Sequence, residues 1–296
     1  MDPHRIAELL TPFLEESSAQ QAESRMGRHP LSPDRVPREP AALSPEQLDQ
    51  ISIYIDLLLR WNARINLTAI RDPEEIVTRH FGESLFAARH LLPCGAGTAA
   101  RLGSDLTTEG LSKAGATNGR PAEMHAEVRD RRHDFQTTSQ DADQSGTSPW
   151  SRSTQSGRVI DQGSGAGFPG LPMKIWSPDT PVTLIESNQK KVAFLREVIR
   201  ALTLTDINVF PRRAEDYPAA SALLLTLRAV ERFEAILPSA AQLLSAGGTL
   251  ALLIGESQVA KAQTLLSTFQ WRDPLPIPLS SSRVLVRATL IQAGGY

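Results

Sequence analysis

The residues best suited to chemistry stand together in one short segment, Asp161-Gln162-Gly163-Ser164-Gly165-Ala166-Gly167-Phe168. An apolar run precedes this segment, which predicts a strand that ends in a glycine-rich loop. Glycines allow the backbone of such a loop to approach a ligand closely, and a following helix offers free N–H groups. The spacing is G-x-G-x-G after an acid, and Phe168 stands where the dinucleotide fingerprint G-x-G-x-x-G has its last glycine. The pattern favours a ligand-binding loop over a plain glycine-rich turn.

Two further acids fall at the ends of the next expected strands. Glu186 ends the run 182–186, where a carboxylate can accept hydrogen bonds from both hydroxyls of a ribose. Glu215 follows the run 207–210, in the segment Arg212-Arg213-Ala214-Glu215. The carboxyl ends of parallel strands share one edge of a sheet, so we expect both acids beside the glycine loop. A ligand that contains a ribose is the chemistry that this arrangement favours.

From Arg158 onwards, short apolar runs alternate with segments of helical character. The runs are 158–161, 182–186, 207–210, 223–227, 249–254 and 284–291, and the helical segments are 189–202, 231–245 and 256–269. This alternation predicts right-handed crossovers and a largely parallel sheet with helices on both faces. Only an irregular segment rich in Pro and Ser joins the last two runs, which favours an antiparallel hairpin at the edge. The predicted fold class is α/β, a Rossmann-like, doubly wound, mostly parallel sheet.

The chain before this sheet is predicted to be helical where it is ordered. Apolar residues at helical spacing indicate a helix within 1–14, and Ser44-Pro45-Glu46-Gln47 forms a capping box that starts a second helix. A third helix is expected to begin at Asp72 and to run to about His90. Two polar segments with few large apolar residues are expected to be disordered. The expected regions are an N-terminal helix 1–14, a linker 15–42, a helical region 43–93, an insertion 94–157 and the sheet domain 158–296, with a small helical subdomain at 123–132 as the less favoured alternative within the insertion.

The composition excludes several classes of protein. The 296 residues hold 31 Lys and Arg against 33 Asp and Glu, a net charge of −2, so affinity for nucleic acid has to come from local patches. One cysteine, Cys94, excludes a disulfide framework and a multi-cysteine metal site, and the six histidines show no metal-ligand spacing. No apolar run reaches the ~18 residues of a membrane span, and the first residues lack the pattern of a signal peptide. A cytoplasmic protein without a bound metal is expected.

The motifs taken together resemble class I S-adenosylmethionine-dependent methyltransferases, which share the acid–glycine loop and the acids after the second and third strands. The runs GSGAGFPGLP at 163–172, IESNQKKVAFL at 185–195 and LRAV at 227–230 resemble the bacterial small-subunit rRNA guanine-N7 methyltransferase family, also called glucose-inhibited division protein B. Trp61-Asn62-x-x-x-Asn66-Leu67-Thr68 and Arg79-His80-x-x-Glu83-Ser84 match the helical region of that family. The resemblance is loose over 1–14 and close over 43–93 and 158–291.

The resemblance implies methylation of guanosine N7 in 16S ribosomal RNA, with S-adenosyl-L-methionine as the cofactor of domain 158–296. It implies cofactor contacts at Gly163, Phe168, Glu186, Ala214, Glu215 and Arg228, to which the glycine spacing adds Gly165 and Gly167. The guanidinium of Arg228 can bind the cofactor's carboxylate or an RNA phosphate, and the resemblance favours the cofactor. Two positions depart from the family, since Glu83 stands where Asp is usual and Ile254-Gly255 where Lys-Gly is common. The missing lysine concerns how a phosphate or the substrate is held rather than the cofactor site.

Guanine N7 carries an unprotonated lone pair, so the implied reaction needs no general base and no catalytic residue is expected. Alignment of N7, methyl carbon and sulfur in a dry pocket can supply the rate. Phe168 is equally suited to shaping this pocket and to packing the loop, and His80 is interpreted as a histidine that packs its helix. The RNA-binding candidates are Lys190, Lys191, Arg64 and Arg79, although each alone is typical of a solvated helix face.

The expected partner is small-subunit ribosomal RNA, free or in a ribosomal particle, without a membrane and with the protein as a monomer. Two other functions stay open. One is a different RNA methyltransferase or a small-molecule methyltransferase, which the matched helical region disfavours. The other is a non-catalytic relative that binds the cofactor or RNA, suggested by Ile254 and the insertion 94–157. The second alternative is disfavoured by the intact residues Gly163, Gly165, Gly167 and Glu186.

Overall fold

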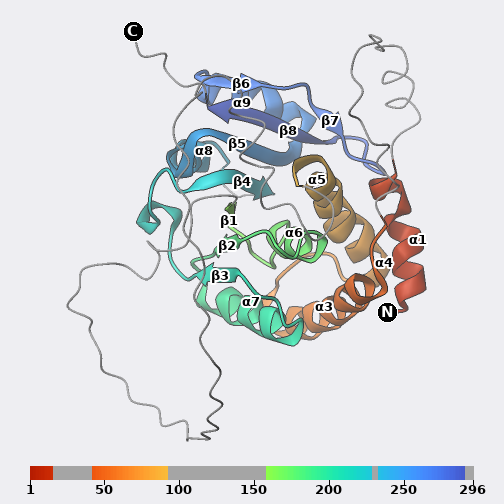
Figure 1. The fold of residues 1–296 in the computed structure, drawn as a ribbon. Helices are drawn as coiled ribbons and strands as arrows, with labels where there is room; N and C mark the ends of the chain where they lie inside the picture. Colours follow the sequence, from red (N-terminus) through yellow and green to blue (C-terminus); the bar gives the residue numbers. More distant parts are fainter. Residues whose placement is uncertain (16–41, 93–157, 229–232, 291–296) are drawn as a thin grey trace, which may run out of the picture. The chain divides into compact units, whose positions relative to one another are not determined.

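The computed structural model describes residues 1–15, 42–92, 158–228 and 233–290. The helices of the first two ranges are α1 Pro3–Leu14, α3 Pro45–Ile65, α4 Pro73–Ile76, the π-helix η1 Val77–Gly82 and α5 Glu83–Leu91 (Figure 1). The side chains of Asp2, Ser44 and Asp72 cap α1, α3 and α4, and proline opens each of these helices. Residues 16–41 of the predicted linker, the predicted insertion and its alternative helical subdomain lie outside the described residues.

The helix predicted from Asp72 is present but not uniform. Its middle, Val77–Gly82, is a π-helix that separates α4 from α5. Such a segment widens the helix locally and frequently occurs at functional sites. Here it carries Arg79 and His80, and Glu83 follows it directly.

Of the described residues, eight strands form one sheet. They are β1 Val159–Gln162, β2 Val182–Ile185, β3 Ile207–Phe210, β4 Ala222–Arg228, β5 Leu244–Gly255, β6 Phe269–Trp271, β7 Leu275–Pro276 and β8 Arg283–Leu290. The order is β3-β2-β1-β4-β5-β8-β6, in which β1 to β5 are parallel and β8 runs antiparallel to β5. The predicted α/β fold is confirmed. The predicted antiparallel pairing of the last two apolar runs is present between β5 and β8. The predicted edge position is wrong, because the short strand β6 pairs with the outer side of β8.

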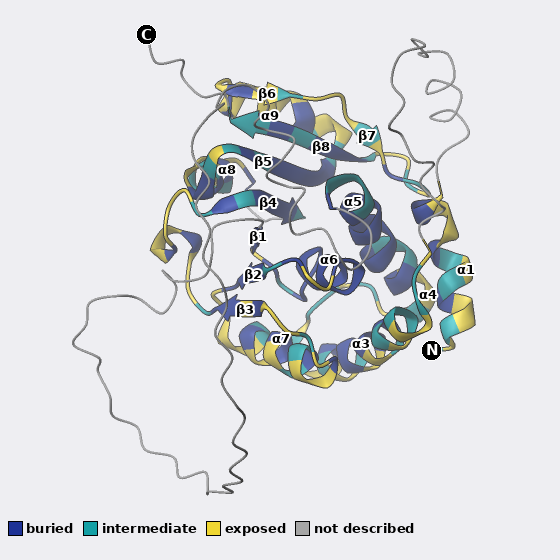
Figure 2. Ribbon diagram, viewed as in Figure 1, coloured by how far each residue is buried: buried dark blue, intermediate teal, exposed yellow. Residues whose placement is uncertain are grey.

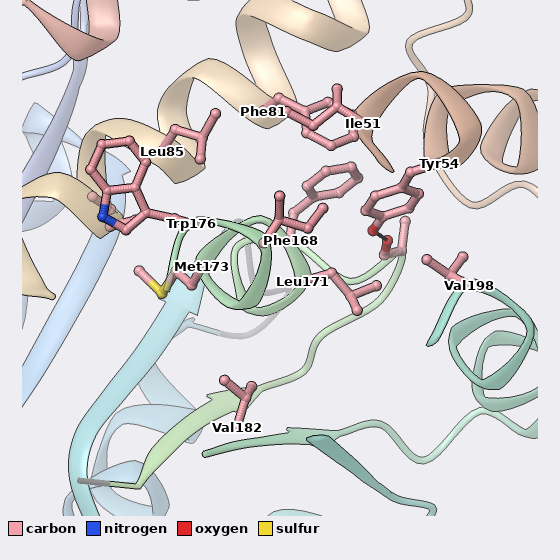
Figure 3. Packing of buried hydrophobic residues seen from close by; sticks show 14 of the residues in the cluster. Ile51, Tyr54, Phe81, Leu85, Phe168, Leu171, Met173, Trp176, Val182 and Val198 are labelled. Carbon is pink, nitrogen blue, oxygen red and sulfur yellow. Dashed lines mark hydrogen bonds between the residues drawn. The ribbon is translucent and has the colours of Figure 1, made fainter. Parts of the chain in front are cut away.

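The helical region and the sheet share a hydrophobic core. The helices after β1 and β2 are α6 Gly170–Trp176 and α7 Gln189–Ala201, and the later ones are η3 Ala214–Asp216, α8 Phe233–Leu243, η4 Glu256–Gln258 and α9 Val259–Leu265. Helix α3 contacts α6 and α7, and α5 contacts α6. Figure 2 shows that α3 and α7 each have a buried face and an exposed face. In Figure 3, Ile51, Tyr54 and Phe81 of the helical region lie beside Phe168 and Leu171. The helices therefore pack directly against the loop that follows β1.

Candidate functional site

The glycine loop leaves β1 through three residues with left-handed backbone conformation. The angle φ is +71° at Gly163, +57° at Gly165 and +90° at Gly167, values that favour glycine. A Cβ on Gly163 would meet no atom within 4 Å, so open space borders the loop there. A Cβ on Gly167 would instead overlap Leu171 and the Tyr54 hydroxyl. Gly163 therefore borders room for a ligand, whereas packing requires glycine at 167.

The acid before the loop belongs to the scaffold. Asp161 lies in β1 and is 1% exposed. Its carboxylate accepts hydrogen bonds from the Gly170 N–H at 3.1 Å and from the Thr226 hydroxyl at 2.9 Å, which ties β1 to α6 and β4. Burial raises the pKa of Asp161 to about 6, although these hydrogen bonds favour its ionised form. The residue holds the loop's base rather than facing the open space beside Gly163.

Glu186 follows β2 and holds the loop from the side. One of its carboxylate oxygens accepts a hydrogen bond from the Gly165 N–H at 2.9 Å, and the other accepts one from the Asn188 N–H at 2.8 Å. A carboxylate offers about four acceptor positions, so each oxygen keeps capacity for a further donor such as a ribose hydroxyl. The structure places Glu186 beside the glycine loop, as the sequence leads us to expect.

The remaining predicted cofactor residues lie along the same edge of the sheet. Ala214 and Glu215 form the turn η3 after β3, the first buried and the second exposed. Arg228 is the last residue of β4. Because the strands run in the order β3-β2-β1-β4, the turn η3, Glu186, the glycine loop and Arg228 follow one another along the carboxyl ends. The eight predicted cofactor residues thus occupy the ends of four neighbouring strands.

Phe168, at the end of the loop, is enclosed by aromatic rings from the helical region (Figure 3). Tyr54 of α3 stacks on it with ring centroids 5.3 Å apart and an interplanar angle of 4°, and His80 stacks at 4.7 Å and 23°. The edge of the Phe81 ring meets it at 5.2 Å. The Tyr54 hydroxyl also donates a hydrogen bond to the Ala166 carbonyl. Phe168 therefore packs the loop against the helices, one of the two roles that the sequence leaves open.

The segment after α3 positions His80. The Asn62 side chain accepts hydrogen bonds from the N–H groups of Leu67 and Thr68 at 2.7 and 3.0 Å, and donates to the Thr68 carbonyl at 2.9 Å. This fixes the turn so that the Thr68 hydroxyl lies 2.7 Å from Nε2 of His80. The matched Trp61–Thr68 motif thus has a physical reason, which is to orient the ring that covers Phe168.

His80 is neutral at physiological pH. Burial, followed by the positive charge of Arg228, lowers its pKa to about 3. Its Nδ1 has no hydrogen-bond partner among the described residues. The interpretation of His80 as a histidine that packs its helix agrees with the structure, and the surface against which it packs is the Phe168 ring.

A buried carboxylate joins three arginines from three elements. Glu83, the first residue of α5, is 1% exposed. It accepts hydrogen bonds from Arg79 of η1 at 3.2 Å, from Arg228 of β4 at 3.0 Å and from Arg283 of β8 at 3.0 Å. The guanidinium carbon of Arg228 also lies 5.9 Å from the centroid of the Phe168 ring. We call Arg79, Arg228 and Arg283 the arginine cluster.

Sequence reasoning missed Arg283. In the register of β5 and β8 it is paired with Gly255, next to the buried Ile254. It also donates a hydrogen bond to the Leu253 carbonyl at 3.1 Å. A guanidinium therefore stands beside the end of the fifth strand, where the lysine expected from the resemblance is absent. The available signal was the position of Arg283 at the start of the last apolar run, facing the end of the run 249–254.

The other RNA-binding candidates lie outside the arginine cluster. Lys190 and Lys191 occupy the first turn of α7, where their N–H groups donate to the Asn188 side chain at 3.0 and 3.2 Å. Arg64 is exposed in the last turn of α3. Of the four candidates, Arg79 is the one that bonds to Glu83, whereas Lys190 and Lys191 follow Glu186 at the carboxyl end of β2.

Neither a cluster of metal-ligating side chains nor a membrane-spanning helix is found in the part of the chain that the structure describes. Within it, no three side chains of His, Cys, Asp or Glu are grouped so as to hold a metal ion. None of its helices is long and apolar enough to cross a membrane. The polar groups at the sheet edge are backbone N–H groups, carboxylates and guanidinium groups, which suit a polar organic ligand.

Comparison with known proteins gives matches over most of the chain. The family described as rRNA small subunit methyltransferase G matches residues 47–98 and 146–273. A ribosomal RNA small subunit methyltransferase G from Chloroflexus aggregans is 32% identical over 84% of this chain and 84% of that protein. One from Xylella fastidiosa is 31% identical over 76% of this chain and 79% of that protein. Among solved structures, TYW2 of P. horikoshii in complex with MeSAdo has 16% identity and a TM-score of 0.41, over 48% of this chain and 60% of that one. The chain belongs to the rRNA small subunit methyltransferase G family.

Proposed function

We propose that this chain transfers a methyl group from S-adenosyl-L-methionine to N7 of a guanosine in 16S ribosomal RNA. Family membership supports a methyltransferase that acts on small-subunit ribosomal RNA. The observation that carries the cofactor assignment is the Glu186 carboxylate, which is bonded to the Gly165 N–H of the glycine loop at 2.9 Å. The N7 position rests on the resemblance of the segments 163–172, 185–195 and 227–230.

The residues at the sheet edge fit this cofactor. A Cβ at position 163 would occupy open space, which leaves room for a ligand against the backbone of the loop. The remaining acceptor capacity of Glu186 suits the two hydroxyls of a ribose. We assign the cofactor to Gly163, Gly165, Gly167, Phe168, Glu186, Ala214, Glu215 and Arg228. In this assignment Gly167 and Phe168 act by fixing the shape of the loop.

The chemistry requires positioning rather than proton transfer. When bound, S-adenosyl-L-methionine supplies an electrophilic methyl group on a positively charged sulfur. The lone pair of guanine N7 attacks without losing a proton, so the chain has to hold and orient both partners and exclude water. The buried aromatic rings of Tyr54, Phe81 and Phe168 exclude water from beneath the glycine loop and hold it in place. His80, with its pKa lowered to about 3, adds no positive charge beside a cationic cofactor. We therefore assign no general base.

The substrate side is assigned to cations that are exposed or half-buried. Arg64, Arg79, Lys190 and Lys191 are proposed to contact RNA phosphates, on ribosomal RNA that is free or in a particle. Because the substrate is a ribosomal RNA, we place the protein in the cytoplasm, and we propose that it acts as a monomer.

Labelled S-adenosyl-L-methionine tests this function. The protein is incubated with 16S ribosomal RNA and with small-subunit particles from a strain that lacks the protein, and the RNA is digested to nucleosides. We expect the label in 7-methylguanosine. Glu186→Ala should abolish both labelling and cofactor binding, whereas Glu234→Ala, at an exposed ion pair with Lys261, should retain both. Label in another nucleoside, or no label on either substrate, would contradict the proposal.

A further inference from the structure

The arginine cluster carries more positive charge than the protein neutralises. Three guanidinium groups meet one carboxylate, that of Glu83, which leaves an excess of two positive charges. The buried Asp161 also acts electrostatically on Arg228, and counting it still leaves an excess of one. Positive charges held close together and partly out of water repel one another, and an anionic ligand relieves this repulsion.

The cluster keeps donors available on its more exposed side. The side chain of Arg79 is 44% exposed and donates through Nε, so among the described residues its two terminal nitrogens have no acceptor. Arg283 is 18% exposed and donates through Nε and Nη2, which leaves Nη1. Arg228 is 9% exposed and donates to Glu83 and to the Arg79 carbonyl. Glu83 and Arg228 thus form the buried base, and Arg79 and Arg283 present the free N–H groups.

The position of the cluster separates it from most of the assigned cofactor residues. Arg228 ends β4, and Arg283 faces Gly255 at the end of β5. The residues Glu186, Ala214 and Glu215 lie instead at the ends of β2 and β3, on the other side of β1. An anion held by Arg79 and Arg283 would therefore lie at the half of the sheet edge that the cofactor's ribose does not need.

We propose that Arg79 and Arg283, held in place by Glu83, bind a backbone phosphate of the ribosomal RNA close to the target guanosine. This inference rests on the proposed function, which supplies the RNA. The planar fork of N–H groups in arginine matches the oxygens of a phosphate and allows two parallel hydrogen bonds. The competing source of an anion is the carboxylate of the cofactor, which the same groups could bind by the same chemistry.

The salt dependence of RNA binding separates these two sources. The wild-type protein is first assayed for methylation of free 16S ribosomal RNA and of small-subunit particles, and affinity is then measured on the substrate that it methylates. Arg79→Gln and Arg283→Gln should each weaken RNA binding about five- to tenfold near 0.15 M salt. Each should also reduce the slope of log affinity against log salt by about one, since a phosphate contact is lost. Affinity for S-adenosyl-L-methionine, measured by calorimetry, should stay within about twofold of wild type.

Arg287→Gln is the matched control. Arg287 lies four residues along the same strand, hence on the same face, and takes no part in the bonds to Glu83. Its variant should keep the slope of the wild type. If Arg283→Gln fails to fold, the exposed Arg79 decides the outcome. An unchanged salt slope of RNA binding for Arg79→Gln would overturn the proposal. A loss of cofactor affinity at that unchanged slope would assign the anion to the cofactor's carboxylate instead. Absence of methylation by the wild type would instead refute the proposed function.

Discussion

Tyr54 lies flat on Phe168, with ring centroids 5.3 Å apart, and its hydroxyl donates to the Ala166 carbonyl two residues before that ring. One side chain of the helical region thus holds the glycine loop through both a ring stack and a hydrogen bond. Burial raises the pKa of Tyr54, so the phenol stays protonated and keeps its donor. The helices before the sheet therefore determine the shape of the loop that we assign to the cofactor.

Tyr54→Phe tests this coupling. The ring stack should persist, but the Ala166 carbonyl loses its buried donor, which costs about 1 kcal/mol of unfolding free energy. Affinity for S-adenosyl-L-methionine should fall severalfold, because the loop becomes less ordered before binding. Urea denaturation and calorimetry measure the two quantities. Trp61→Phe is the control, since it removes a bond to Glu197 that lies outside the loop and should leave cofactor affinity intact. Unchanged affinity in Tyr54→Phe would show that the stack alone holds the loop.

Gly163→Ala tests the open space beside the loop. Gly163 and Gly247 have nearly the same backbone angle, φ of +71° and +74°, and a Cβ on either meets no atom within 4 Å. Alanine at either position should therefore lower the free energy of unfolding by about 1–2 kcal/mol, because it strains the backbone. Only Gly163→Ala should weaken cofactor binding, by about tenfold or more, because its methyl group would enter the ligand space. Equal cofactor affinities in the two variants would move the cofactor away from Gly163.

Glu83→Gln tests the buried carboxylate that joins the arginine cluster. Removal of one partner from a buried ion network typically costs about 3–5 kcal/mol, since the remaining charges lose their compensation. We expect a loss of this size in urea denaturation at neutral pH. Glu74→Gln removes the exposed ion pair with Arg5 and should leave the unfolding free energy nearly unchanged. A similarly small effect of Glu83→Gln would mean that the guanidinium groups are separately solvated.

The pH dependence of stability should reveal the lowered pKa of His80. Its pKa is about 3 in the folded state, against an ordinary value of 6.5. Between these values the unfolded chain binds a proton that the folded protein does not, so acidification destabilises the protein. At pH 5 the loss of unfolding free energy relative to neutral pH is roughly 2 kcal/mol. The stability advantage of wild type over His80→Gln should therefore shrink from pH 7.5 to pH 5.

The titration of Asp161 changes the stability with pH in the opposite direction, so both proteins in the comparison must contain Asp161. Its pKa is raised to about 6 from 3.8, so between these values the folded protein binds a proton that the unfolded chain has released. Its contribution therefore makes the protein more stable on acidification. Comparing wild type with His80→Gln at each pH cancels this contribution. A difference between the two proteins that does not vary with pH would exclude a depressed pKa for His80.

Patterns within short stretches of sequence predict the part of the site whose residues lie close together along the chain. The glycine loop and Glu186 follow directly from short strands and their ends, and the Gly165–Glu186 bond spans 21 residues. The strands β6 and β7, with three and two residues, are too short to produce a periodic signal. The π-helix at Val77–Gly82 has the same apolar spacing as an ordinary helix at this length. The bond between Glu83 and Arg283 spans 200 residues, and no pattern within one element encodes it.

These separations also order the events of folding. Contacts between distant residues form after the intervening chain has been arranged, because closing a long loop costs entropy that local contacts do not. Glu83 can bond to Arg228 only when the chain has been extended by 145 residues, and to Arg283 only after β8 has been made. A chain still being synthesised can bring the glycine loop and Glu186 together before β8 has left the ribosome. The growing polypeptide therefore lacks the complete arginine cluster, and the proposed phosphate-binding site, until the last strand is made.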